Sequence, residues 1–440
     1  MSKPQVIVIG AGFTGLAAAR DLVRAGFAVT VLEAQDCVGG LAGAFATEGE
    51  RLDRFYHHWF NSDREIMQLV SELGLEDQVT WQATRTGIYY NRSVYRLSSP
   101  GDLLRFQALP LVDRLRLGLL YLRARRVRDW QALEEYTAAE WLKHLGGHNV
   151  WRVVWEPLLR GKFGPWADRV SAVWFWNKIK LRGGSRSSTG REQLGYFQGS
   201  FARLAEALAQ AIHAAGAVIR LSSPVSELSQ GERGQWEVRG HWGALRADAV
   251  VITTAPALAA EMLASAAPQE ALTTLRRTPY LANLCLVLEL DRSLGSTYWL
   301  NVNDPHFPYV GVIEHTQFQH PACYGGRHVV YLSKYLVETD PLYQLTDAEV
   351  MDFSVPHLTR MFPAFRKEWV QRFHVWRARW AQPVVEPHYS ALLPPKEGLL
   401  PGIFMTSMAH IYPEDRGTNH AVREGRGIAA LVSQRLRREG

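Results

Sequence analysis

The stretch that decides the fold runs from Gln5 to Gly15 and reads QVIVIGAGFTG. Its first half is a continuous apolar run, which is typical of a strand buried on both faces of a parallel sheet. It leads directly into three glycines with the G-x-G-x-x-G spacing of a phosphate-binding turn. Residues 14–26 then have helical periodicity, and residues 28–34 read as a second apolar strand. The sequence therefore predicts a βαβ unit that binds a dinucleotide.

Each position of the glycine turn has a mechanical role. Gly10 permits the tight turn, Gly12 lets the backbone approach a pyrophosphate, and Gly15 lets the helix pack closely on the strand. Phe13 and Thr14, which stand between Gly12 and Gly15, begin the helix, and its N-terminus faces the phosphates.

An acidic residue and a second glycine pair follow the second strand. Glu33 stands where a carboxylate can accept hydrogen bonds from ribose hydroxyls and would repel a 2′-phosphate, which disfavours NADP. Ala34 comes next, and Gly39 and Gly40 precede Leu41 a few residues later.

This succession resembles the flavin-containing amine oxidase superfamily, which includes protoporphyrinogen oxidases, phytoene desaturases and, more distantly, UDP-galactopyranose mutase. The resemblance implies an α/β fold with a Rossmann-type, GR2-like FAD-binding domain, an inserted mixed β-sheet substrate domain and a helical lobe. It assigns residues 1–55, 200–260 and 400–440 to the cofactor domain. Residues 56–199 and 261–399 would form the substrate domain, with the lobe around 62–160.

The resemblance also carries over cofactor contacts along the chain. Gly39 and Gly40, flanked by Ala34 and Leu41, would lie beside the FAD pyrophosphate. The remaining expected contacts are Val225 at the adenine and Asp415, Gly417, Thr418 and Asn419 at the flavin ring. No cysteine follows Cys323, so the C-terminal thioether found in some amine oxidases is excluded and FAD is expected to be non-covalent.

Two segments are candidates for the catalytic site. The first, residues 53–60, would lie near the isoalloxazine, where His57 or His58 can hydrogen-bond the ring, move a proton or orient the substrate. The alternative is that both histidines are packed among aromatic residues. The second segment, residues 155–186, resembles the start of the substrate sheet and places aromatic residues beside cations, Arg182 among them. This pattern suits a diphosphate or a carboxylate, and equally a buried aromatic cluster with solvated charges.

Residues 102–128 combine leucines at helical spacing with many arginines, and Pro110 breaks the pattern. Such a helix can contact a membrane surface or a lipid-like substrate, or it can bury its leucines within the lobe.

Composition narrows the remaining possibilities. The 440 residues carry a formal net charge of +6, but the arginines are dispersed and no nucleic-acid-binding module is visible. We expect no cleaved signal peptide, because the predicted first strand already begins at Gln5. The sequence shows no apolar run long enough to span a bilayer and no histidine or cysteine spacing typical of a metal site. We therefore expect a cytoplasmic enzyme without a metal, and peripheral attachment to the inner face of the membrane is the alternative.

The leading functional hypothesis is an FAD-dependent oxidase or desaturase in which a small, lipid-like or diphosphate-bearing substrate transfers a hydride to flavin N5. The alternatives are a flavin-dependent sugar-nucleotide mutase, a simple amine oxidase, and a flavin-binding protein without catalysis of its own.

Overall fold

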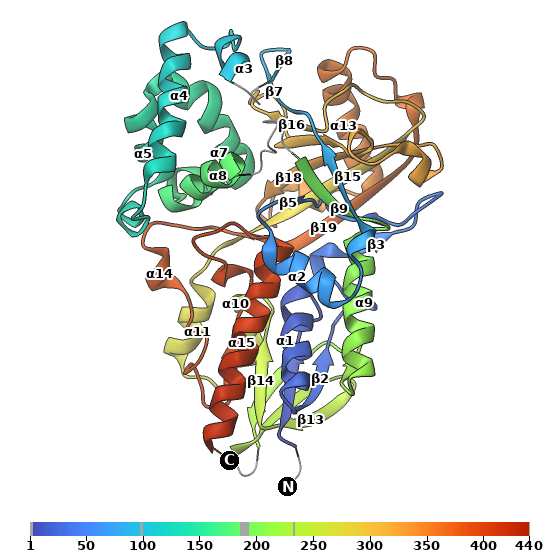
Figure 1. Ribbon diagram of the computed structural model, residues 1–440, viewed down its shortest axis with the longest axis vertical. Helices are drawn as coiled ribbons and strands as arrows, with labels where there is room; N and C mark the ends of the chain where they lie inside the picture. The colour runs from blue at the N-terminus through green and yellow to red at the C-terminus, as the bar shows by residue number, and fades with distance from the viewer. Residues whose placement is uncertain (1–2, 97–99, 185–192, 232–233, 440) are drawn as a thin grey trace.

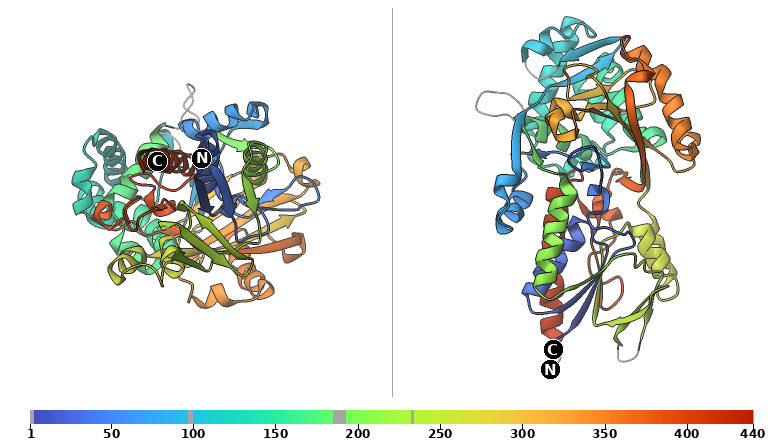
Figure 2. Two further views of the ribbon diagram at one scale, coloured as in Figure 1. Left: turned by 90° about the horizontal axis from the view of Figure 1, so that it is seen from below. Right: turned by 90° about the vertical axis from the view of Figure 1, so that its right-hand side faces the viewer.

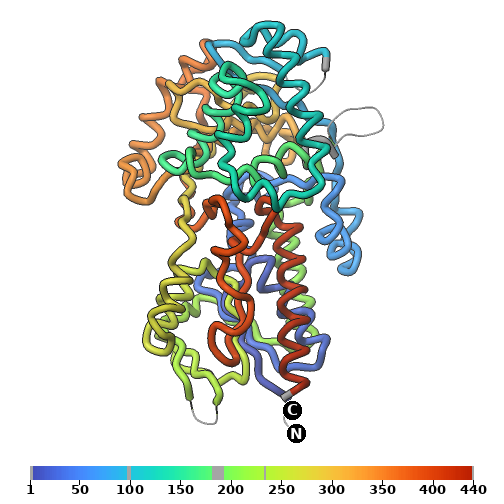
Figure 3. The backbone as a smooth tube through the Cα atoms, turned by 90° about the vertical axis from the view of Figure 1, so that its left-hand side faces the viewer, coloured from blue at the N-terminus to red at the C-terminus, as the bar shows by residue number. Residues whose placement is uncertain are grey.

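The computed structural model describes residues 3–96, 100–184, 193–231 and 234–439, which form a Rossmann-type domain, a mixed-sheet domain and a helical lobe (Figure 1). The Rossmann-type domain is built from three separate stretches of the chain. Both chain ends lie together at the end of this domain that is farthest from the other two (Figure 3).

A five-stranded parallel sheet forms the centre of the Rossmann-type domain. Its strands, in spatial order, are β10 (Val218–Arg220), β2 (Ala28–Leu32), β1 (Gln5–Ile9), β14 (Ala249–Ile252) and β20 (Ile403–Met405). The predicted first strand is therefore the central one, and every strand predicted for this domain is present.

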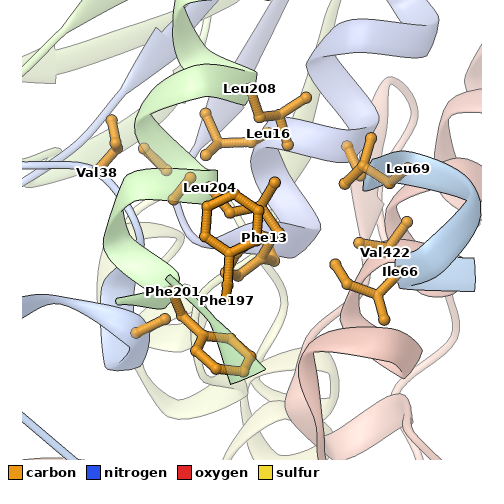
Figure 4. Packing of buried hydrophobic residues seen from close by; sticks show 14 of the residues in the cluster. Phe13, Leu16, Val38, Ile66, Leu69, Phe197, Phe201, Leu204, Leu208 and Val422 are labelled. Carbon is orange, nitrogen blue, oxygen red and sulfur yellow. The ribbon is translucent and has the colours of Figure 1, made fainter. Parts of the chain in front are cut away.

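Helices cover one face of this sheet, and a small antiparallel sheet covers the other (Figure 2). The helices are α1 (Phe13–Arg24), α9 (Phe201–Ala214) and α15 (Thr418–Glu439). The opposite layer contains β11 (Glu227–Gln230), β12 (Trp236–Gly240), β13 (Gly243–Ala247), α10 (Pro256–Met262) and α11 (Gln269–Arg276). Figure 4 shows how Phe13 and Leu16 of α1 pack against Leu204 and Leu208 of α9.

The second domain is organised around a seven-stranded mixed sheet. Its strands, in spatial order, are β19 (Val370–Pro383), β15 (Tyr280–Leu290), β18 (His328–Leu336), β17 (Gly311–Glu314), β16 (Trp299–Val302), β7 (Thr86–Tyr90) and β8 (Ser93–Arg96). Only the β16–β7 pair is parallel among these described strands. Smaller elements accompany this sheet: β3 (Ala44–Phe45), β4 (Leu52–Asp53), β5 (Trp59–Phe60), β6 (Val79–Ala83), β9 (Gln193–Phe197), α12 (Pro341–Gln344) and α13 (Asp347–Met361). Two further helices lie elsewhere: α2 (Arg64–Glu72) packs against α15, and α14 (Tyr389–Leu392) contacts the helical lobe.

The helical lobe differs in extent from the expectation. It consists of α3 (Pro100–Leu104), α4 (Leu111–Arg126), α5 (Ala138–Gly146), α6 (His148–Val150), α7 (Glu156–Phe163) and α8 (Ala172–Gly184). The lobe therefore continues to Gly184, and the segment expected to begin the substrate sheet is helical. Its apolar residues are buried on several sides, and such a run does not distinguish a buried helix from a strand by its periodicity.

The break predicted at Pro110 is confirmed, because this residue directly precedes α4. In the described ranges, no helix is both long and apolar enough to cross a bilayer. Within the same ranges, no three acidic, histidine or cysteine side chains gather as metal ligands would. Cys37, Cys285 and Cys323 are unpaired.

Candidate active site

A cavity of about 580 Å³ connects the Rossmann-type domain to the space between the mixed sheet and the helical lobe. Gly10, Gly12 and Glu33 line one end, and Tyr121 and Trp155 line the other.

The glycine turn has the geometry that its sequence predicts. A Cβ atom on Gly15 would lie 1.9 Å from the Gly10 carbonyl oxygen, so only glycine allows α1 to pack this closely on β1. A Cβ atom on Gly12 would meet no atom within 4 Å. The second glycine pair closes over the first, because the Gly39 N–H donates to the Ala11 carbonyl at 2.8 Å. Space for a ligand is therefore left beside Gly12.

The Glu33 carboxylate is buried and held by the backbone. Its two oxygens accept hydrogen bonds from Ala11 N–H at 2.7 Å and from Gln35 N–H at 2.9 Å. Each carboxylate oxygen can accept more than one hydrogen bond, so both can also receive a ribose hydroxyl.

The start of α15 lies at the same cavity and is anchored by its side chains. Thr418 Oγ1 accepts a hydrogen bond from the Trp59 indole at 2.8 Å, and Asn419 Oδ1 accepts one from Ile66 N–H at 3.1 Å. Because both side chains are engaged, the backbone N–H groups at this helix start are what the protein offers to a ligand. Gly417 lines the cavity just before them.

Asp415 lines the cavity, but other protein groups occupy its carboxylate. It accepts a hydrogen bond from the Trp174 indole at 3.0 Å, lies 3.5 Å from Lys162 Nζ and forms an ion pair with Lys178. Burial opposes its ionisation, yet Lys162 and Lys178 hold the pKa of Asp415 well below its ordinary value. The arrangement favours a role in fixing these cations rather than a direct contact with the flavin ring.

The two candidate histidines both line the cavity and differ in their partners. His58 Nδ1 lies 3.1 Å from the Tyr298 hydroxyl, and its ring packs edge-on against Trp299. His57 Nδ1 has no hydrogen-bond partner within the described part of the chain. Burial and the nearby Arg416 lower the pKa of His57 to about 4, so its imidazole is neutral at neutral pH.

Cations and aromatic rings meet in the wider part of the cavity. Lys162 Nζ lies 4.8 Å from the Trp174 ring centre and 5.4 Å from that of Tyr335. Burial lowers the pKa of Lys162 to about 7, with Lys178 and Arg416 acting in the same direction and Asp415 opposing them.

Some predicted residues lie elsewhere. Gly15, Ala34 and Val225 are not among the described residues that line the cavity, and Gly15 instead serves the packing of α1. The side chain of Arg182 lies outside the described part of the structure.

Sequence reasoning missed Lys162, Arg416 and Trp155 as cavity residues. Arg416 could have been found, because it stands between two predicted cofactor residues. Trp155 and Lys162 lie within the candidate segment 155–186, but nothing in the sequence distinguished them from its other aromatic and basic residues.

Comparison with known proteins identifies the family. The model of the family described as flavin containing amine oxidoreductase matches residues 13–433. The chain belongs to this family. Membership in the flavin-containing amine oxidoreductases confirms the predicted superfamily and its flavin cofactor.

Individual members of the flavin-containing amine oxidoreductases match shorter segments. Putrescine oxidase of Kocuria rosea is 47% identical over 83 residues, which are 19% of this chain and 16% of that protein. Mitochondrial protoporphyrinogen oxidase of Nicotiana tabacum is 27% identical over 175 residues, covering 39% and 34% respectively. The chain spans at most about two fifths of the length of the curated relatives it matches.

A solved structure shares the whole fold. Reduced UDP-galactopyranose mutase superposes with a TM-score of 0.78 at 14% identity, covering 99% of this chain and 95% of that one. This likeness concerns the fold alone.

Proposed function

We propose that the protein is an FAD-dependent oxidoreductase that removes a hydride from a C–H bond of a small, largely apolar substrate. One observation carries this proposal: a single cavity joins the glycine turn and Glu33 to a chamber walled by Tyr121, Trp155 and Phe175. A dinucleotide bound at the turn would extend its reactive end toward that chamber.

The residues present fit FAD. The space beside Gly12 accommodates the pyrophosphate, Glu33 faces the ribose, and the start of α15 offers backbone N–H groups to the flavin pyrimidine edge. When bound, FAD supplies the hydride acceptor. None of the three cysteines is among the described cavity residues, which supports non-covalent binding.

The chain's own residues position the substrate and control protons. The aromatic walls exclude water and orient an apolar substrate. His57, neutral and with Nδ1 unpaired among the described residues, can hold one hydrogen bond at the reacting centre.

A net oxidation is favoured over a mutase reaction. The relatives that match by sequence include oxidases and desaturases, whereas the mutase matches in fold alone.

The test is the absorption spectrum of the purified protein before and after denaturation. We expect a flavin spectrum and release of intact FAD into solution. A colourless protein that FAD does not reconstitute would overturn the proposal.

We also propose that α4 attaches the protein to an anionic membrane surface. Leu111, Val112, Leu115, Leu119 and Leu122 are each at least half exposed along this helix. The exposed arginines of the same helix are Arg116, Arg123, Arg125 and Arg126. Exposed leucines beside arginines complement both the apolar and the charged parts of such a surface.

Sedimentation with vesicles tests this attachment. Wild type should bind vesicles that contain phosphatidylserine more tightly than vesicles of phosphatidylcholine alone, and added salt should weaken binding. Replacing Leu115 and Leu119 together by Ser should lower binding at least about tenfold, because each leucine loses its transfer to the lipid. Leu221→Ser, at an exposed leucine of the Rossmann-type domain, is the matched control. Equal binding by the double variant and the control would contradict attachment through α4.

A further inference from the structure

Three cations converge on one carboxylate in the wall of the cavity. Lys162 comes from α7, Lys178 from α8, and Arg416 from the loop before α15; all three act on Asp415. The two lysines lie on successive helices of the lobe, far before Asp415 in the sequence, so the fold brings them to this carboxylate, whereas Arg416 is its neighbour in the chain.

The cluster carries more positive than negative charge. Among the described acidic residues that line the cavity, Glu33 lies at the end of β2 and Asp63 at the start of α2, and neither pairs with these cations in the described structure. One carboxylate thus faces three cations, and the excess persists even when Lys162 loses its proton. Lys162 is mostly shielded from water, where an excess of positive charge is unfavourable, so a bound anion would stabilise the cluster.

Aromatic rings surround the ammonium group of Lys162 and form a cage that this side chain fills. Trp174, Tyr335 and Phe163 have ring centres 4.8, 5.4 and 5.8 Å from Lys162 Nζ. Aromatic faces with a carboxylate are the surroundings in which proteins bind a substrate ammonium. Here the chain's own ammonium occupies them, so a protonated amine would find no space there and would be repelled by the neighbouring cations.

Both lysines remain reachable from the cavity. The Lys162 side chain is 17% exposed and that of Lys178 is 37% exposed, and both line the cavity. Arg416 also lines the cavity, and its hydrogen bonds to Gln382 and Tyr335 hold the guanidinium in place beside the two lysines.

We propose that this cavity selects a substrate bearing an oxyanion, a carboxylate or a phosphate, which binds against Lys162 and Lys178, and that it rejects protonated amines. The proposal rests on the proposed function, because it names the substrate class of the same cavity.

The experiment uses the FAD-bound protein in a buffer free of phosphate and carboxylates. Benzoate, phenyl phosphate, benzyl alcohol and benzylamine share one aromatic ring and differ in charge. Their binding is followed by the flavin absorption change and by calorimetry. At least one oxyanion should bind about tenfold or more tighter than benzyl alcohol, and benzylamine should bind more weakly than the alcohol. The tighter of the two oxyanions distinguishes a carboxylate site from a phosphate site.

Two variants test whether Lys162 and Lys178 cause the preference for oxyanions over amines. Lys162→Met removes the ammonium from the aromatic cage while Lys178 still neutralises Asp415, and it should lower the ratio of oxyanion to amine affinity at least about tenfold. Lys178→Met should lower oxyanion affinity similarly. Lys180→Met is the matched control, because Lys180 lies on the same helix, packs over Trp176 and does not line the cavity.

Tighter binding of benzylamine than of either oxyanion by wild type would overturn the proposal, as would affinity ratios that both lysine variants leave unchanged. The absence of bound or bindable FAD would instead refute the proposed function, and the spectrum shows this before any ligand is added.

Discussion

The substitution Gly12→Ala separates cofactor binding from folding. Gly12 has φ −71° and ψ 175°, which alanine adopts without strain, and the added Cβ would meet no atom within 4 Å. Alanine is less favourable than glycine at a helix N-cap, which lowers stability, but it also reduces the conformational entropy of the unfolded chain, which raises stability. The free energy of unfolding of the apoprotein should therefore change by less than about 1 kcal/mol.

Gly12→Ala should instead weaken the binding of FAD. A methyl group in the space beside α1 would displace the pyrophosphate and weaken one or two charge-assisted hydrogen bonds, each contributing about 1.5–3 kcal/mol. The FAD dissociation constant should therefore rise about 10-fold or more. Gly15→Ala is the contrasting variant: its Cβ would lie 1.9 Å from a backbone oxygen, so the apoprotein itself should lose about 1–3 kcal/mol or more.

The assay combines urea unfolding of the apoproteins with fluorescence titration of FAD. If Gly12→Ala binds FAD as tightly as wild type, the space beside Gly12 is not the pyrophosphate site and the reasoning is refuted. If Gly12→Ala destabilises the apoprotein as much as Gly15→Ala, the claimed free space is wrong.

Three further outcomes are expected in urea unfolding experiments. In α15, Gly427→Ala should raise the free energy of unfolding by about 0.5–1 kcal/mol, because the added Cβ atom would lie in free space. Gly425→Ala should lower the free energy of unfolding, because its Cβ atom would lie 2.3 Å from a carbonyl oxygen of α1, and effects of the same sign would contradict this packing. Burial raises the pKa of Asp53 from 3.8 to about 7, so the contribution of Asp53 to the free energy of unfolding is complete below pH 3.8 and falls by up to about 4 kcal/mol as the pH rises toward 7. Asp53→Asn should flatten the dependence of stability on pH over this range, and an unchanged slope would exclude Asp53 as its cause. Trp59→Phe, which removes the hydrogen bond to Thr418, should cost about 1–3 kcal/mol, and a smaller loss would show that this bond does not anchor α15.

The cofactor end was predictable because its signals are local. The strand, the glycine spacing and Glu33 lie within one short segment, and each residue type has a steric or hydrogen-bonding reason for its place. The position of Gly39 against Ala11 follows from the same unit.

The substrate end was less predictable because its contacts are distant in sequence. Asp415 is drawn toward Lys162 and Lys178 by a fold that no local pattern describes. The leucines of α4 lie on several sides of the helix, and only packing decides that Leu117 is buried while Leu115 is exposed.

The central position of β1 affects how the chain assembles. Val6 pairs with Val29 on one side and with Ala249 on the other, and α15 packs against α1 from the far end of the chain. One edge of this apolar strand therefore stays uncovered until most of the protein has been synthesised. We expect nascent chains to depend on chaperones that shield this edge, and the cofactor site to form late in folding.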